Sequence, residues 1–366
     1  MKKRVALFVV LVAALFFAAA CNNNNENAEN NSSGSVSFIG ISMPTQYSPR
    51  WIDDGNSLVE QLENLGFLTI LRYANNVVAT QVEQINEMID EGVDILVVAS
   101  IDGSALSGVL ARAAREGIVI IAYDRLIMGT ANVNYYATFD NFAVGVMQAN
   151  SLLLGLGINE GATGPFNIEL FGGSLDDNNA FIFYDGAMSI LEPLIEEGIL
   201  TVRSGQLGMD AVGSIGWSAE RAQGRMAEIL SQFYYDARID AVLSPYDGIS
   251  LGVIEALREA GYGTAAMPWP IVSGQDATIA SVQSIIDGEQ FATVFKDTRE
   301  LAAATTRIIQ AIIAGEPVPV NDITTYYNDA KIVPSYLLGI LHVDASNWRE
   351  ILVDTGYHCE TEFILP

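Results

Sequence analysis

Charged, amide and aromatic side chains recur at one kind of place in this sequence, after short runs of apolar residues, either directly or across a short loop; Pro49–Trp51 are expected to close such a loop. Asp124 and Arg125, for example, follow the run Ile118–Tyr123. In chain order, the segments of this kind are Pro49–Trp51, Asp124–Arg125, Asp140–Asn141, Asp176–Asn179, Tyr246–Asp247, Gln275–Asp276 and Lys296–Asp297. If the apolar runs are parallel strands, these segments gather beyond the carboxyl ends of the strands, where open α/β sheets bind ligands.

The residue types in these segments suit one kind of ligand. Carboxylates accept hydrogen bonds from hydroxyls, Arg and Lys donate, and Asn and Gln do both. An ionised partner strengthens each bond to a neutral hydroxyl, and Trp51 adds a flat apolar ring. The set therefore predicts a pocket for a polyhydroxylated ring. A phosphate ligand is disfavoured, because the sequence contains no Walker-type phosphate loop.

Some of the charged residues have a structural alternative. Asp124 and Arg125 are equally consistent with a structural ion pair at the end of a strand. Asp102 and Asp247 each precede a glycine and a helical pattern, which is typical of helix caps. Capping is the interpretation we prefer for Asp102.

The same holds for residues outside the strand ends. Asp53 and Asp54 are expected to open a helix and to interact with its positive end. Trp217 and Trp269 are expected to pack in the core, with a place at the rim of the pocket as the alternative for Trp217. The prediction of a pocket rests on several segments converging and not on any one side chain.

The elements that position these segments follow one rhythm of apolar strand, loop, amphipathic helix and glycine. Val82, Ile85 and Ile89 lie on one helical face, Gly92 ends that helix, and the strand 94–99 follows. Continuous apolar strands between helices indicate a parallel α/β sheet that is buried on both faces. The rhythm restarts near residue 166, with helices expected around residues 180–195, 218–234 and 249–260.

A chain of 366 residues suits two domains and a processed N-terminus. The stretch from Asp94 to Gly103 also resembles the stretch from Asp240 to Gly248. We therefore expect two similar doubly wound lobes.

The N-terminus predicts export. Residues 1–20 combine a basic start with the apolar run Val5–Ala20, which is short for a bilayer span and typical of a secretory signal peptide. Cys21 and a polar tract to Ser35 follow, in the order of a bacterial lipoprotein signal, so we expect lipid on Cys21 and a flexible tether over residues 21–35. The alternative is an ordinary signal peptide with an incidental cysteine.

Charge and cysteine content exclude several classes. The formal net charge of −26 disfavours nucleic acid as a partner. Cys359 is the only cysteine besides Cys21, so no disulfide is expected once Cys21 is acylated. His342 and His358, the only histidines, do not make a usual zinc set with one cysteine, so no metal and no cofactor are expected.

Several stretches resemble one known family. They are Arg50–Trp51, Gln81–Ile89, Ala122–Arg125, Ala137–Asn141, Asp177–Ala180, Ser244–Gly248, Ser273–Ala277 and Val294–Thr298. Together they make the chain, from about residue 39 to residue 357, similar to the type I periplasmic sugar-binding proteins of ABC transporters. The multiple-monosaccharide and xylose branches of that family are the most similar.

The resemblance implies a site and a domain plan. Ligand contacts are implied for Arg50, Trp51, Asp124, Arg125, Asp140, Asn141, Asn179, Tyr246, Asp276 and Lys296. The N-terminal lobe is implied to comprise residues 36–140 and 297–328, and the C-terminal lobe residues 141–296 and 329–366. Three hinge crossings are then expected, near residues 141, 296 and 329.

Two positions bear on the ligand. Xylose binders carry Glu where this chain has Pro49, and Asn where it has Tyr246. The expected ligand is therefore an aldose, such as galactose, glucose, arabinose or xylose, and not xylose alone.

The function implied is that of an extracytoplasmic binding lipoprotein and not of an enzyme. We expect a monomer that closes on the sugar and delivers it to the permease of an ABC transporter. Presentation of the sugar to a chemoreceptor or a histidine kinase is the alternative. A glycoside hydrolase is disfavoured, because Arg, Lys and Asn accompany the acids, and a DNA-binding sugar regulator is disfavoured by the export signal.

Overall fold

The computed structural model describes residues 36–365. The expected signal peptide, the lipidated Cys21 and the tether lie outside the described residues. Within 36–365, no helix is both apolar enough and long enough to cross a membrane.

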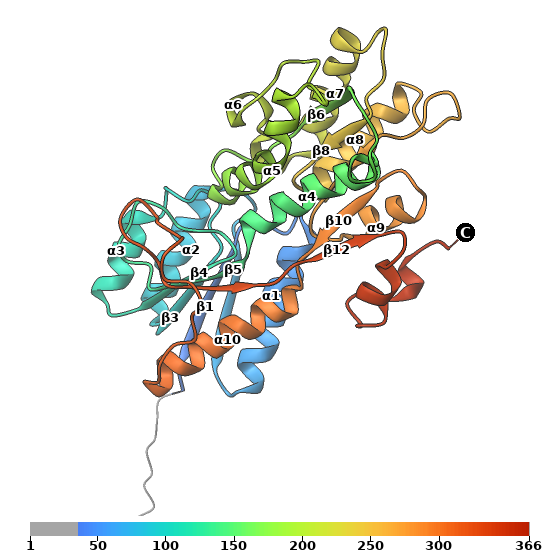
Figure 1. Ribbon diagram of the computed structural model, residues 1–366. Coiled ribbons are helices and arrows are strands. Elements are labelled where there is room, and N and C mark those ends of the chain that lie inside the picture. Colours follow the sequence, from blue (N-terminus) through green and yellow to red (C-terminus); the bar gives the residue numbers. More distant parts are fainter. Residues whose placement is uncertain (1–35, 366) are drawn as a thin grey trace, which may run out of the picture. The chain divides into compact units, whose positions relative to one another are not determined.

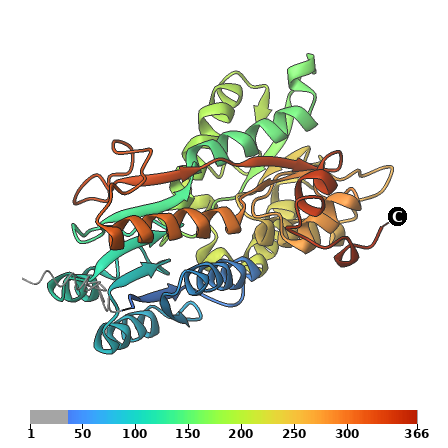
Figure 2. The same ribbon diagram turned by 90° about the horizontal axis from the view of Figure 1, so that it is seen from below.

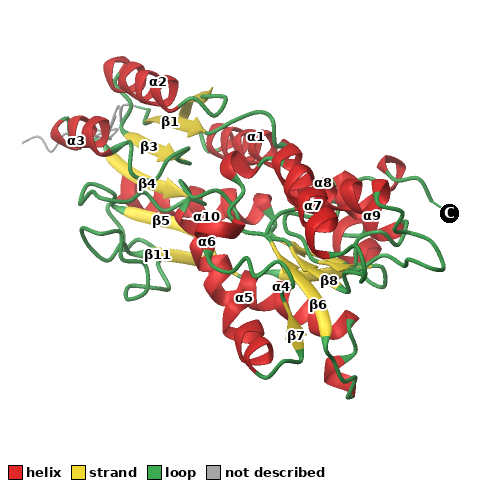
Figure 3. Cartoon of the chain, turned by 90° about the horizontal axis from the view of Figure 1, so that it is seen from above, coloured by secondary structure: helices red, strands yellow, loops and turns green. Residues whose placement is uncertain are grey.

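The first lobe is built on a six-stranded parallel sheet with the strand order β11-β5-β4-β3-β1-β2. Figure 3 shows β11, β5, β4, β3 and β1 of this sheet side by side. Their bounds are β1 Phe38–Met43, β2 Leu68–Tyr73, β3 Ile95–Val98, β4 Val119–Tyr123, β5 Tyr135–Phe139 and β11 Ser335–Leu338. The expected parallel sheet with its helical crossovers is confirmed.

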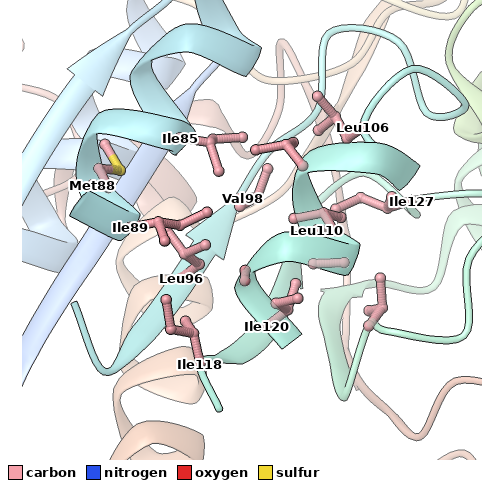
Figure 4. Packing of buried hydrophobic residues seen from close by; sticks show 14 of the residues in the cluster. Ile85, Met88, Ile89, Leu96, Val98, Leu106, Leu110, Ile118, Ile120 and Ile127 are labelled. Carbon is pink, nitrogen blue, oxygen red and sulfur yellow. The ribbon is translucent and has the colours of Figure 1, made fainter. Parts of the chain in front are cut away.

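Helices cover both faces of this sheet. Helices α2 (Val78–Glu91) and α3 (Ser107–Arg115) cover one face, where Ile85 and Met88 of α2 pack with Leu96 of β3. Figure 4 shows this cluster from close by. Helices α1 (Pro49–Asn64) and α10 (Thr298–Ala314) cover the other face through residues such as Leu58 and Ile308. Full burial of each such side chain contributes about 1.5–3 kcal/mol.

The second lobe repeats the plan on a smaller scale. Its parallel sheet has the order β7-β6-β8-β9, with β6 Phe166–Leu170, β7 Leu200–Thr201, β8 Ala241–Leu243 and β9 Ile271–Val272. Helices α4 (Asn141–Gly155) and α5 (Asn178–Glu196) pack on one face, and α7 (Ala219–Phe233) and α8 (Asp247–Glu259) pack on the other. The short helices α6 (Met209–Val212) and α9 (Ile279–Ile286) complete the lobe. The later helices expected from the sequence are therefore present, and Figure 1 shows their arrangement.

Helix ends follow from sequence in several places. Gly92 ends α2 with φ of 83°, and Gly315 ends α10 with φ of 67°. Both angles are in the left-handed region that glycine adopts without steric cost. The start of α1 differs from expectation, because Pro49–Trp51 form its first turn and do not close a loop. Proline suits this position, because the first helical N–H has no partner within the helix.

The chain crosses between the lobes three times. The first crossing lies between β5 and α4 and the second between β10 (Ala292–Phe295) and α10, as expected near residues 141 and 296. The third crossing, expected near residue 329, is wrong. Strand β11 still belongs to the first sheet, beside β5, and the chain crosses after it to β12 (Leu341–Asp344), which pairs antiparallel with β10. Figure 2 shows this extended segment, drawn in red.

The physical reason for the later crossing is a buried amide in the first lobe. The Nδ2 of Asn328 donates to the carbonyl oxygens of Ile127 (2.9 Å) and Thr130 (2.8 Å). These bonds hold the chain at residue 328 to the first lobe, and β11 then adds to the free edge of the sheet.

Candidate functional site

A cavity of about 660 Å³ is lined by residues of both lobes. It brings together eight of the ten predicted site residues: Arg50, Trp51, Asp124, Arg125, Asn179, Tyr246, Asp276 and Lys296. They come from the first turn of α1, the end of β4, the starts of α5 and α8, the loop after β9 and the crossing after β10. The prediction that segments after the strands converge is therefore confirmed.

The other two predicted residues, Asp140 and Asn141, do not line the cavity. Asp140 is exposed, and its carboxylate caps α4 by accepting the N–H of Ala143 (3.0 Å). Asn141 is fully buried, and its Nδ2 donates to the Oδ1 of Asn179 (3.1 Å). In this structure Asn141 supports a cavity residue from behind, and Asp140 serves its own helix.

The floor of the cavity is organised around Arg50, which is 6 % exposed. Its Nε and Nη2 contact Asp54 Oδ2 at 3.0 and 2.9 Å, and its Nη2 also contacts Asp124 Oδ1 at 3.1 Å. Asp54 also accepts the hydroxyl of Tyr123. Asp53 and Asp54 therefore do not lie in the first turn of a helix, as the sequence suggested, and Asp54 is wholly buried behind the cavity.

The pKa values of the two buried acids of the first lobe, Asp124 and Asp54, are shifted in opposite directions. Burial on its own would raise the pKa of Asp124, but Arg50, Lys296 and Arg125 together lower this pKa to about 2. Burial raises the pKa of Asp54 to about 6, because Arg50 and Tyr123 offset only part of the desolvation. Asp124 is therefore an ionised acceptor at the cavity wall at neutral pH.

Lys296 stands between the two strand-end aspartates. Its Nζ lies 3.4 Å from Asp276 Oδ1 and 3.7 Å from Asp124 Oδ1, and the side chain is only 2 % exposed. Asp276 Oδ1 is also 3.8 Å from Arg50 Nη1. Among the residues described, this oxygen is buried and has no hydrogen-bond partner. The two cations therefore balance the charge of this carboxylate without filling its hydrogen-bonding capacity.

Both strand-end aspartates adopt an unusual backbone conformation. Asp124 has φ of 58° and Asp276 has φ of 95°, and Ala277 follows at 51°. Non-glycine residues in the left-handed region cost on the order of 1–3 kcal/mol each and concentrate at functional sites. The strain turns both carboxylates out of the strand direction and toward the cavity they line.

Arg125 joins the lobes. Its Nε contacts Asp177 Oδ2 at 2.8 Å, and its Nη1 donates to the carbonyl of Ser100 at 3.1 Å. The guanidinium groups of Arg125 and Arg50 lie 5.2 and 4.5 Å from the ring centre of Trp51. The Trp51 ring is thus 4 % exposed and already engaged by two cations.

Asn179 also connects the lobes. Its Nδ2 donates to the carbonyl oxygen of Asp124 (2.7 Å), and its Oδ1 accepts from Asn141 (3.1 Å). The hydroxyl of Tyr136 lies 3.2 Å from this Oδ1, but its shorter bond is to the carbonyl of Asp124 (2.7 Å). The second N–H of the Asn179 amide remains for a ligand. Tyr246 makes a third link, because its hydroxyl lies 3.3 Å from Ser48 Oγ.

Several other residues that line the cavity were not predicted as ligand contacts, among them Asp177, Phe183, Trp217 and Gln275, although the strand-end segments included Asp177 and Gln275. Phe183 lies four residues after Asn179 on α5, and Asp54 lies four residues after Arg50 on α1. The i,i+4 spacing on a helix was therefore an available signal for both. Gln275 is 3 % exposed with an unpartnered Oε1, and its place beside Asp276 was the signal for it.

Residues expected to cap or to pack also need correction. Asp102 accepts the N–H of Ser104 (2.8 Å) in a turn that precedes α3, so it does not cap that helix. The carboxylate of Asp247 accepts from Thr278 N (2.8 Å) and Thr293 Oγ1 (2.7 Å). It therefore supports the turn that carries Asp276. Trp217 lines the cavity, which was the alternative for it, and Trp269 packs against the core of the second lobe.

The tail residue His358 bonds to protein and not to a metal set. Its Nε2 lies 2.8 Å from the carbonyl of Ala277, and Cys359 is exposed. Over residues 36–365, no group of three or more His, Cys, Asp or Glu side chains is placed to hold a metal ion.

Comparison with known proteins decides the family. Residues 39–317 match the periplasmic binding protein domain. The chain belongs to the periplasmic binding protein family. Its resemblance to the type I sugar-binding members, stated above from motifs, is confirmed by relatives along almost the whole chain.

Two of those relatives are sugar-binding periplasmic proteins. The multiple sugar-binding periplasmic protein SbpA of Azospirillum brasilense is 54 % identical, over 89 % of this chain and 90 % of the relative. The D-xylose-binding periplasmic protein of Escherichia coli is 35 % identical, over 88 % of this chain and 92 % of the relative.

A solved structure is also similar. An ABC transporter solute-binding protein from Clostridium phytofermentans, with β-D-glucose bound, shares 45 % identity and a TM-score of 0.86. The match covers 90 % of this chain and 100 % of that protein. This family is one of solute-binding proteins and not of enzymes.

Proposed function

We propose that this protein captures a monosaccharide, an aldose such as glucose, galactose, arabinose or xylose, between its two lobes. One observation carries the proposal: ionised and amide groups from both lobes, among them Asp124, Asp276 and Asn179, converge on one cavity. Such a set offers acceptors and donors together, and a sugar hydroxyl both donates and accepts. The similar protein that holds β-D-glucose supports the same ligand class.

The ligand contacts proposed are those of the cavity. Asp124 and Asp276 accept from hydroxyls, and Arg50, Arg125, Lys296 and the free N–H of Asn179 donate. Trp51 and Phe183 provide apolar surface for the C–H groups of the ring. Asp140 and Asn141 remain outside this set in the geometry described above.

Binding is proposed to close the hinge. The site is completed only when both lobes contribute, so a sugar that bridges Asp124 and Asp276 favours the closed arrangement by its differential affinity. Closure also removes water, which strengthens each charged hydrogen bond. The closed form is what we expect the permease of an ABC transporter to recognise.

Presentation of the sugar to a receptor is a second candidate function. The relative from Rhizobium radiobacter, 54 % identical over 87 % of this chain, bears the name multiple sugar-binding periplasmic receptor ChvE. Transport and sensing use the same sugar site, so the site itself favours neither. Pull-down with the permease and with candidate chemoreceptor or histidine-kinase domains, with and without sugar, separates the two.

Attachment at the outer face of the cytoplasmic membrane, or in the periplasm, through acylated Cys21 is proposed from the sequence of residues 1–35. Together with a tether over residues 21–35, this leaves the lobes free to move at the surface. Cys21→Ser is expected to move the protein from the membrane fraction to the soluble fraction. We propose that the binding unit is monomeric, which size-exclusion chromatography with light scattering tests.

A panel of aldoses tests the central proposal. Isothermal titration calorimetry with glucose, galactose, arabinose and xylose is expected to show one-to-one binding of more than one sugar. Absence of binding by all four would refute the ligand class. Turnover of aryl glycosides in a parallel assay would instead indicate a hydrolase, which the low pKa of Asp124 disfavours because that carboxyl is not available as a general acid.

A further inference from the structure

The cavity is larger than one pyranose ring requires. A volume of about 660 Å³ lies mid-range among the roughly 300–1,000 Å³ of pockets that hold drug-sized ligands. This volume remains although the lobes already touch: Arg125 contacts Asp177, and the N–H of Gly103 donates to the carbonyl of Asp176 (3.1 Å). Further closure therefore has little room to reduce it.

The cavity has a buried floor and an exposed rim. The floor is formed by the charged residues assigned above to the monosaccharide. Each is less than a tenth exposed except Arg125, whose side chain is 12 % exposed. The rim is formed by Tyr47, which is 80 % exposed, and by Asn76, Trp217 and Glu220. Tyr47 and Asn76 belong to the first lobe, and Trp217 and Glu220 to the second. Among the residues described, no hydrogen bond or ion pair joins these two sides of the rim.

The rim carries the chemistry of a sugar subsite. Tyr47 and Trp217 supply aromatic rings, the hydroxyl of Tyr47 and the amide of Asn76 both donate and accept, and the carboxylate of Glu220 accepts. The Trp217 ring is fixed in place, because it lies in T-shaped contact with Phe183 and Tyr246 at centroid distances of 6.4 and 6.0 Å.

Trp217 is also held in a strained conformation. Gly216 and Trp217 are both left-handed, with φ of 67° and 56°. An aromatic residue in this region is costly and persists where its surroundings fix it. Here Gly173 leaves the space for the ring, since a Cβ on Gly173 would come within 2.1 Å of it. The Nε1 of Trp217 is buried without a protein partner.

We propose that Tyr47, Asn76, Trp217 and Glu220 form an outer subsite for the second unit of a disaccharide or glycoside, whose first ring occupies the floor. This inference rests on the proposed function. The ligand class of the protein then extends from free aldoses to their β- or α-linked glucosides.

The test compares glucose with cellobiose, maltose and gentiobiose by calorimetry on the full binding unit. Because the linkage decides where the second ring emerges, at least one of the three disaccharides is expected to bind within about tenfold of glucose. The double variant Tyr47→Ala/Asn76→Gly should weaken that disaccharide about tenfold, equivalent to about 1.4 kcal/mol, and change glucose affinity less than about twofold. Glycine is chosen because Asn76 has φ of 60°.

The matched control is an exposed tyrosine outside the cavity. Tyr235 is as exposed as Tyr47, at 81 %, and lies outside the cavity, so Tyr235→Ala should change neither affinity. If glucose binds and all three disaccharides fail, the outer subsite is refuted and the monosaccharide site stands. Equal weakening of both ligands by the double variant also refutes it. If no free aldose binds, the proposed function itself fails and the outer subsite falls with it.

Discussion

Each lobe presents one aspartate to the cavity and buries a second one behind it. In the first lobe Asp124 is in front and Asp54 behind, and in the second lobe Asp276 is in front and Asp247 behind. The front residues share a left-handed backbone, and the back residues are both fully buried. The two lobes are thus built alike at their binding edges, as the repeated rhythm of the sequence suggested.

The partners of the two pairs differ. Asp54 and Asp124 are both bonded to the guanidinium of Arg50. Asp247 is bonded only by neutral donors, Thr278 N and Thr293 Oγ1, while Asp276 keeps an unpartnered oxygen. The first lobe therefore holds its half of the site in a completed ionic network. The second lobe holds a carboxylate whose hydrogen bonds are incomplete until a ligand supplies them.

Replacement of Asp124, whose carboxylate belongs to the ionic network of the first lobe, should have the largest effect on stability and binding. Asp124→Asn leaves Arg50 and Lys296 buried with one ionised partner fewer, and removal of one member of a buried ion pair costs about 3–5 kcal/mol. We expect a loss of unfolding free energy of that order together with loss of sugar binding. Urea unfolding followed by circular dichroism measures the first, and calorimetry measures the second. Unfolding free energy equal to wild type would show that the network does not stabilise the first lobe.

Replacement of Asp276, whose Oδ1 has no hydrogen-bond partner, should separate the effect on sugar affinity from the effect on unfolding free energy. Asp276→Asn removes charged hydrogen bonds to the ligand, each worth about 1.5–3 kcal/mol, so affinity should fall on the order of a hundredfold. Unfolding free energy should fall less than in Asp124→Asn, because Asp124 accepts a hydrogen bond from Arg50 whereas Asp276 Oδ1 has only ion-pair contacts, at 3.4 and 3.8 Å. The comparison between lobes breaks if Asp276→Asn destabilises the protein as much as Asp124→Asn does.

Asp247, the back residue of the second lobe, predicts a pH dependence. Burial raises its pKa from 3.8 to about 7, and hydrogen bonds from Thr278 and Thr293 offset this only in part. A raised carboxyl pKa means that stability is fully present below pH 3.8 and is lost as pH rises toward 7, by at most about 1.4 kcal/mol per pH unit. Asn at this position does not ionise, so Asp247→Asn should lack that loss.

The measurement is the difference in unfolding free energy between wild type and Asp247→Asn across pH 4 to 8. The contributions of the other titrating groups cancel in this difference. Any destabilisation by the amide that does not depend on pH changes the size of the difference but not its slope against pH. The unfolding free energy of the wild type, relative to that of the variant, should fall as pH rises to about 7 and stay constant above that pH. Parallel curves over the whole range would mean that Asp247 stays charged or neutral throughout.

The floor of the site was predictable from sequence because it depends on backbone topology. Parallel strands place their carboxyl ends at one edge, so residues that follow strands, such as Asp124 and Asp276, meet there whatever their own contacts are. The prediction was weaker where side chains choose among partners. Asn141 follows a strand as Asp124 does, yet its amide bonds to Asn179 behind the wall, and nothing in its local sequence distinguishes the two cases.

The errors in the fold have a similar origin. The third crossing was placed too early because strand 335–338 has no local signal for the lobe it joins. Its place is decided by Asn328, whose amide bonds to carbonyls some two hundred residues earlier. Asp54 was interpreted from its position near a helix start, although the i,i+4 spacing to Arg50 was present in the sequence and indicated the ion pair that the structure contains.

The contact between the lobes gives the smallest expected effect and the sharpest test of how they cooperate. Asp177 precedes α5 and bonds to Arg125 of the first lobe at 2.8 Å. It also caps α5 by accepting the N–H of Asn179 (3.0 Å), a role that asparagine fills equally well. Asp177→Asn should therefore preserve the helix and weaken only the closed arrangement, with a loss of affinity of about fivefold, or about 1 kcal/mol.

Because the pair forms only when the lobes meet, the loss should come from faster sugar dissociation, with association nearly unchanged. Stopped-flow fluorescence measures both rate constants. Asp90→Asn is the matched control, since it breaks an ion pair with Arg112 inside the first lobe and should leave both rates as they are. A slower association with unchanged dissociation would place Asp177 on the path of sugar entry instead.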